Sequence, residues 1–199
     1  KIKVPLLSAA NWGGQGLHPR GNFEGFLRSG SKEKWLEVHG IAHWTHFYTD
    51  YGREIQLRFF DYFLKGKKNG CNRQPTVQLQ VRHVDRFVQR TEKAWPLPAT
   101  KWTKLYLDND TLNLTPKVPA VGKKASYKGF SDGLTYLLPA QKEDMEITGP
   151  ISVKLFASSD TVDTDFFIVF RVFSPDMKEI VFQGALDPHT PIGQGWLRA

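Results

Sequence analysis

The chain of 199 residues contains a single cysteine, Cys71. One thiol cannot form an internal disulfide, which excludes the small disulfide-stabilised scaffolds and slightly favours a reducing compartment such as the cytoplasm. The sequence also lacks any run close to the roughly 18 apolar residues that a membrane-spanning helix requires. It starts at Lys1 with neither a hydrophobic signal core nor an initiator methionine, so we expect it to begin within a longer protein.

Positive charge is in mild excess. The chain has 27 Lys and Arg residues against 20 Asp and Glu residues, which gives a net charge of +7. The basic residues are spread thinly, and the one local run, at 65–68, lies beside the turn signal Asn69-Gly70. A nucleic-acid partner is therefore not expected. The chain is 40% hydrophobic and 24% charged, which is ordinary for a globular protein.

The first 72 residues carry the pattern of a parallel α/β sheet. Short apolar runs at 4–10 and 34–38 are typical of strands buried on both faces, and the spacing at 23–28 and 52–65 predicts helices, the second ended by Gly66. A loop carrying His39, His43 and His46 is expected after the second strand. Two strands cannot close such a sheet, so we expect residues 1–72 to be the end of a larger α/β domain.

From about residue 75 onward the apolar residues alternate with a period of two, as in half-buried strands. Strands are predicted at 77–81, 102–107, 134–138, 147–157, 166–173 and 179–183, with a hairpin turn at 174–176. Strands joined by Pro, Gly and Asp turns without helices predict an antiparallel sandwich or jelly roll over 73–199, truncated at its end.

One motif resembles a nucleophile elbow, the G-x-S-x-G pattern at 129–133 with Ser131 at its centre. That elbow requires a buried strand before the serine and a helix after it. Here a Lys-rich segment precedes it and a strand-like segment follows, so we interpret Ser131 as part of a turn in the β domain.

The histidines His39, His43 and His46 have i, i+4, i+7 spacing, which would place metal ligands together on a helix. No H-E-x-x-H pattern accompanies them and Gly40 follows the predicted strand, so neither a metal ion nor a cofactor is expected. Two interpretations stay open. One histidine is a general base after a strand of a parallel sheet, or all three are loop residues satisfied by backbone groups.

Several motifs in a fixed order resemble the CocE/NonD hydrolases, the family of cocaine esterase and X-Pro dipeptidyl-peptidases. The resemblance covers almost the whole chain. Its motifs are V-P-L-L-S-A-A-N-W at 4–12, the segment 34–43, F-F-D-Y-F-L-K-G at 59–66, W-P-L-P at 95–98, T-G-P at 148–150 and D-T-D-F at 163–166. The resemblance implies the end of an α/β-hydrolase domain over 1–72 and that family's C-terminal jelly roll over 73–199.

The resemblance also implies a Ser-Asp-His triad with its histidine at His43 and its serine upstream of Lys1. The family's acid position falls on Gly14, so either another carboxylate, with Glu24 and Asp50 as the candidates, orients His43, or the acid role is unfilled. Each of the two candidates is more often a solvated surface group than a triad acid. Trp12 and Trp44 flank the implied site and are candidates for a substrate pocket, with the protein core as the alternative.

The function that follows from the resemblance is cleavage of acyl esters or X-Pro-type peptide bonds through an acyl-enzyme. The partner is then a small-molecule ester or peptide, the chain alone is expected to be inactive, and self-association is left open. A second hypothesis is a non-catalytic binding module whose β-sandwich recognises carbohydrate or a protein partner.

Overall fold

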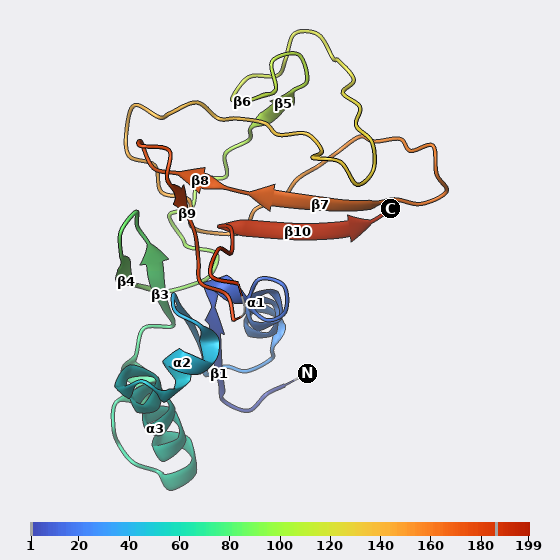
Figure 1. Ribbon diagram of the computed structural model, residues 1–199. Helices are drawn as coiled ribbons and strands as arrows, with labels where there is room; N and C mark the ends of the chain where they lie inside the picture. The colour runs from blue at the N-terminus through green and yellow to red at the C-terminus, as the bar shows by residue number, and fades with distance from the viewer. Residues whose placement is uncertain (1, 186) are drawn as a thin grey trace. The chain divides into compact units, whose positions relative to one another are not determined.

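The computed structural model describes residues 2–185 and 187–199, except for the side chain of His43. The chain is mostly β with few helices (Figure 1). By compactness it divides into one unit of residues 1–98 and 148–199 and a second of residues 99–147. Within the described residues no helix combines the length and the apolar character needed to cross a membrane.

A four-stranded sheet organises the first unit, in the order β1 (Leu6–Asn11), β2 (Lys34–His39), β3 (Val77–Arg82) and β4 (Phe87–Glu92). β2 pairs in parallel with both β1 and β3, whereas β3 and β4 form an antiparallel pair. The predicted parallel pairing of the first two strands is therefore confirmed. β3 joins the same sheet although it follows residue 72, and the predicted domain boundary there remains a proposal.

The core lies on the two faces of this sheet. On one face the helix α1 (Pro19–Arg28) buries Phe26 among strand side chains. That cluster contains Ala10, Phe26, Leu36, Val38, Val77, Leu79, Trp95 and Leu97. A second cluster joins Trp35 of β2, Phe59 and the free thiol of Cys71, which is buried. β2 is covered on both faces, as its near-continuous apolar sequence predicts.

Two helices follow β2, the short α2 (His43–Tyr48) and the longer α3 (Asp50–Lys65). The Thr49 side chain accepts a hydrogen bond from the Gly52 backbone N–H at the start of α3, and Gly66 ends the helix with φ 67°. The predicted end of α3 is confirmed. The predicted loop is wrong at His39, which is the last residue of β2, and at 43–48, because a helix of fewer than two turns lies below the length at which periodicity is recognisable.

The remaining strands of the first unit form two antiparallel pairs, β7 (Asp165–Phe170) with β10 (Gly193–Arg198) and β8 (Val172–Phe173) with β9 (Glu179–Ile180). The β8–β9 pair confirms the predicted hairpin. In the second unit β5 (Tyr106–Asp108) pairs with β6 (Asn113–Thr115), and one bridge joins Asn113 to Leu137. Short 3-10 turns occupy Trp12–Gly14 (η1) and Cys71–Arg73 (η2).

Several predicted strands are shorter than expected. The structure places no strand at 147–157, a described segment in which Phe156 is 92% exposed, and the strand predicted at 134–138 reduces to the bridge at Leu137. An alternating pattern forms a strand only where a neighbouring strand supplies hydrogen-bond partners, and no partner strand reaches residues 147–157 in the described structure.

Candidate functional site

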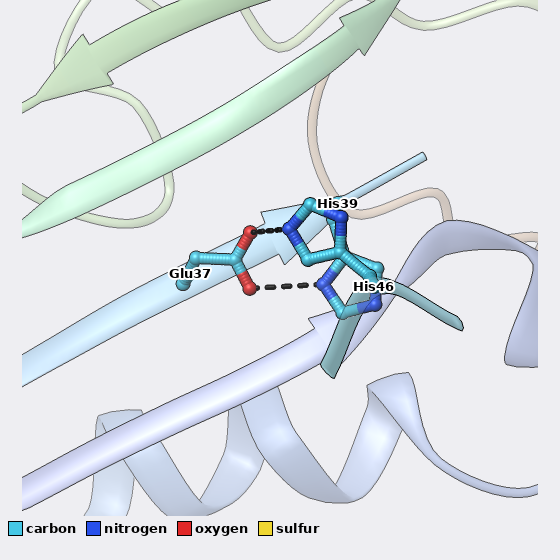
Figure 2. A group of neighbouring side chains, drawn as sticks. All are labelled: Glu37, His39 and His46. Atoms are coloured by element: carbon cyan, nitrogen blue, oxygen red, sulfur yellow. Dashed lines mark hydrogen bonds and ion pairs between the residues drawn. The ribbon is translucent and has the colours of Figure 1, made fainter. Parts of the chain in front are cut away.

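Three titratable side chains meet at the carboxyl end of β2. Glu37 and His39 are two residues apart on the strand and therefore share one face, while His46 comes from α2 (Figure 2). His39 Nδ1 is hydrogen-bonded to Glu37 Oε2 at 2.9 Å, and His46 Nε2 lies 3.8 Å from Glu37 Oε1. The two imidazole rings stack with their centroids 4.1 Å apart. We call Glu37, His39 and His46 the Glu-His-His cluster.

The cluster is buried, and burial dominates its electrostatics. Glu37 is only 2% exposed, and burial raises the pKa of its carboxyl, an effect that the hydrogen bond and the positive charge of His39 oppose. Burial, and then the charge of His39, lower the pKa of His46 to about 4. His46 is therefore neutral near pH 7, with a ring nitrogen able to accept a proton or a metal ion.

Tyr51 of α3 closes the cluster on its far side. Its ring lies 4.8 Å from the His46 ring, centroid to centroid, at an interplanar angle of 60°. Burial, followed by the negative charge of Glu37, raises the pKa of the Tyr51 hydroxyl. The phenol is thus neutral at physiological pH, and a polar group from α3 joins those from β2 and α2.

A cavity of about 230 Å³ opens next to the residues that follow β2. Its walls include Gly40 and Ile41, the guanidinium-bearing Arg82 and Arg86, and the rings of Phe87 and Phe182. The Arg82 guanidinium lies 5.3 Å from the centre of the Phe87 ring, which stacks on Phe182 at 6.2 Å. The cavity therefore combines aromatic surface with charged groups of both signs, because Asp85 also lines it and pairs with Arg86 at 3.1 Å.

The comparisons with known proteins decide the family. Residues 69–199 match the X-Pro dipeptidyl-peptidase C-terminal non-catalytic domain. The chain belongs to that family. It is 28% identical over 160 residues to the cocaine esterase of Rhodococcus sp. (strain MB1 Bresler), covering 61% of this chain and 28% of the esterase. It is 25% identical over 177 residues to a putative Xaa-Pro dipeptidyl-peptidase of Bacillus anthracis, covering 79% of this chain and 28% of that protein.

A solved structure gives the same result. The crystal structure of a CocE/NonD family hydrolase from Staphylococcus aureus superposes with a TM-score of 0.82 and 28% identity, over 98% of this chain and 36% of that chain. The chain thus corresponds to a C-terminal portion of a CocE/NonD hydrolase. It spans between a quarter and two fifths of the length of these relatives.

The histidine that the CocE/NonD resemblance selects, His43, is the first residue of α2. Its side chain lies outside the described residues, so its role as the general base stays a prediction. Of the two candidate acids, Asp50 is exposed and Glu24 is half-buried. Glu24 forms an ion pair with Arg28 along α1, and Asp50 forms one with Arg53 at 2.9 Å along α3. Their assignment as the triad acid likewise stays a prediction.

Gly14, to which the resemblance assigns the acid, has a close neighbour where a side chain would begin. A Cβ atom there would come within 2.6 Å of the side-chain oxygen of Asn11, a residue that is fully buried. The Asn11 amide thus occupies the space in which a carboxylate at position 14 would have to begin.

The two candidate pocket tryptophans lie in different surroundings. Trp12 packs against Phe23, Trp95 and Phe182, and its indole N–H donates to the Gln80 carbonyl at 2.8 Å. Trp44, on α2, is 47% exposed. Trp12 therefore serves at least the core, and a pocket role for both residues remains a prediction.

Sequence reasoning missed Glu37. The signal was present, because a carboxylate at the centre of the apolar strand sequence Trp35-Leu36-Glu37-Val38 has to be buried and therefore needs a partner. The histidine spacing alone did not point to it, because Glu37 precedes the helix and comes from a different element.

Proposed function

We propose that this chain is part of a serine hydrolase that cleaves acyl esters or X-Pro-type peptide bonds through an acyl-enzyme. The observation that carries the proposal is the likeness over 98% of the chain to a CocE/NonD family hydrolase, supported by relatives named cocaine esterase and putative Xaa-Pro dipeptidyl-peptidase. In this proposal residues 1–72 form the end of an α/β-hydrolase domain and residues 73–199 form the β domain.

His43 acts in this proposal as the general base. A serine hydroxyl supplied by residues outside this sequence attacks the substrate carbonyl carbon, and His43 takes its proton. The bond between the carbonyl carbon and the leaving group then breaks, and His43 returns the proton to the departing oxygen or nitrogen. A water molecule then attacks the acyl-enzyme through the same steps, which releases the carboxylic acid product and restores the serine. The place of His43, directly after β2, supports this role because reactive groups gather at the carboxyl ends of parallel strands.

The β domain takes no part in the chemistry. The description of the matched family as a non-catalytic domain supports this separation for residues 69–199. The same description also favours the alternative, in which the β domain recognises carbohydrate or a protein partner and the chain has no hydrolytic function.

The test uses the complete protein that contains this chain, with p-nitrophenyl esters and X-Pro p-nitroanilides as substrates. The variant His43→Ala is expected to lower kcat by about 10³-fold or more, because only oxyanion stabilisation and binding then remain. The exposed His189→Ala serves as the control and should keep full activity. A fluorophosphonate should label one serine in the active protein.

Two outcomes would contradict the proposal. Normal turnover in His43→Ala would show that His43 is not the general base. The absence of both turnover and serine labelling in the complete protein would favour the binding module.

A further inference from the structure

We propose that Glu37, His39 and His46 bind one divalent transition-metal ion of the zinc class. The ligand set is two imidazoles and one carboxylate, and the ligand atoms all lie within 4.8 Å of one another. Imidazole nitrogen together with a carboxylate oxygen selects zinc and its neighbours over the oxygen-seeking Mg²⁺ and Ca²⁺. The three side chains are drawn together in Figure 2.

The first observation behind the proposal is a set of buried polar atoms without hydrogen bonds. Glu37 Oε1 and His46 Nε2 face each other, and both are buried without a hydrogen bond of normal geometry in the described structure, as is the neighbouring Tyr51 hydroxyl. Glu37 and His46 are 2% and 6% exposed. A buried carboxylate oxygen without a partner is costly, and a cation between the two atoms would remove that cost.

The second observation is the distance between these two atoms. At 3.8 Å they are too far apart for a hydrogen bond. Two ligands that each lie about 2.0 to 2.2 Å from one tetrahedral zinc ion are themselves roughly 3.3 to 3.6 Å apart, a few tenths of an ångström less than the observed separation. A small approach of Glu37 Oε1 and His46 Nε2 would therefore give the separation that a zinc ion requires.

His39 supplies the third ligand. Its Nδ1 is hydrogen-bonded to the other oxygen of Glu37 at 2.9 Å, and its ring is stacked on that of His46, so the nitrogens that face Glu37 lie on the same side of both rings. To bind the ion, the His39 ring would have to turn so that Nδ1 leaves Glu37 Oε2. Three protein ligands leave a fourth position for water or for a group of another segment.

The consequence for the fold is a link between β2 and α2. Glu37 and His39 belong to the strand, whereas His46 belongs to the helix that begins at His43. An ion shared by the three side chains would fix the backbone of α2 against the end of the sheet. The inference does not depend on the proposed hydrolase function, because its test measures metal binding and not turnover.

The test titrates Zn²⁺ and Co²⁺ into purified full chain that has been stripped with EDTA. We expect one equivalent of Zn²⁺ per chain with a Kd below about 1 μM, an increase of Tm on binding, and visible d–d bands of Co²⁺ in a site of low symmetry. Glu37→Gln and His46→Gln should each weaken Zn²⁺ binding by about 100-fold or more. The exposed Glu33→Gln and His189→Gln are matched controls and should bind as the parent does.

Three results would overturn the proposal. The first is that the parent chain does not bind Zn²⁺ or Co²⁺ stoichiometrically. The second is that both cluster variants still bind the metal ion as the parent does. The third is that the two control variants lose binding. If the cluster variants do not fold, X-ray absorption of the Zn²⁺-loaded parent decides the question. Two imidazoles in the first coordination shell support the site, and any other shell excludes it.

Discussion

At the scale of the residue, the unusual choice in this sequence is a carboxylate in the centre of a buried strand. The neighbours of Glu37 along β2, Leu36 and Val38, are completely buried and belong to the core cluster on the opposite face. Glu37 itself faces His39 and His46. One face of the strand is thus apolar, whereas the other carries the buried Trp35 beside the polar Glu37 and His39, which the chain keeps at a cost in desolvation.

Truncating a side chain on the apolar face of β2 should lower the stability of the fold. Leu36→Ala is expected to lower the free energy of unfolding by about 2 to 5 kcal/mol, because Leu36 is 0% exposed and its loss leaves a cavity. Leu57→Ala, at a position that is 55% exposed, should change it by less than about 1 kcal/mol. Urea unfolding followed by circular dichroism measures both. Equal effects would show that β2 is not at the centre of the folded core.

A glycine provides a second prediction at this scale. A Cβ atom on Gly13 would lie 1.9 Å from the backbone oxygen of Gln183, a group that cannot move aside as a flexible side chain can. Gly13→Ala should therefore destabilise the chain by about 1 to 3 kcal/mol. Gly16→Ala, where no atom lies within 4 Å, is the control and should leave Tm nearly unchanged. A Gly13→Ala protein as stable as the parent would mean that residues 13 and 183 are not in contact.

At the scale of the element, the end of α3 depends on Asp61. Its carboxylate pairs with Lys65 at 2.7 Å and with Lys67 at 2.8 Å, and its carbonyl accepts hydrogen bonds from the N–H groups that follow the helix. The hydrogen bonds from Lys65 and Lys67 lower the pKa of Asp61. The side chain and the backbone of one residue thus hold the same helix end.

This arrangement predicts a pH dependence. Because the pKa of Asp61 is lower in the folded chain than in the unfolded one, its carboxylate adds stability above the unfolded value near 3.8. That contribution is lost as the pH falls through the lower folded value. Asp61→Asn should reduce the urea midpoint at pH 6 and have little effect at pH 2. A difference that is the same at both pH values would exclude the pairing as its source.

How far the sequence predicts an element depends on where its stabilisation comes from. α3 is encoded locally, through its periodic apolar side and the glycine that ends it, and it was predicted to within two residues at its start. The segment 147–157 has an equally clear alternation but forms no strand, because a strand also needs a partner and no local signal supplies one. The Glu-His-His cluster is harder still to predict from the sequence, because its side chains come from a strand and a helix and no sequence motif links them.

At the scale of the whole molecule, the two compact units differ in how well they are packed. Residues 99–147 hold one short strand pair and one bridge, and their exposed apolar side chains include Trp102 and Phe130. The unit of residues 1–98 and 148–199 contains the four-stranded sheet and both core clusters. Local stability should therefore be unequal along the chain.

Hydrogen exchange should make this inequality visible. Amides in β2 and β3 are expected to exchange slowest, and those in 99–147 to exchange faster by about 100-fold or more, because few buried contacts oppose their opening. Mass spectrometry of peptides from a deuterated sample measures both regions in one experiment. Uniform protection along the chain would contradict the division into units of unequal stability.

The mixed sheet has a consequence for how proteins of this family can be recombined. The matched domain begins at residue 69, yet its strand β3 adds to a sheet begun before that residue, with Leu36 beside Val77 and Val38 beside Leu79. In a chimaera that exchanges domains at residue 69, β3 from one protein would have to pair with β2 from another. The chimaera would have to preserve this register and the fit of the completely buried side chains on both strands. The two regions are therefore expected to change together in evolution, as the two sides of one interface inside a single chain.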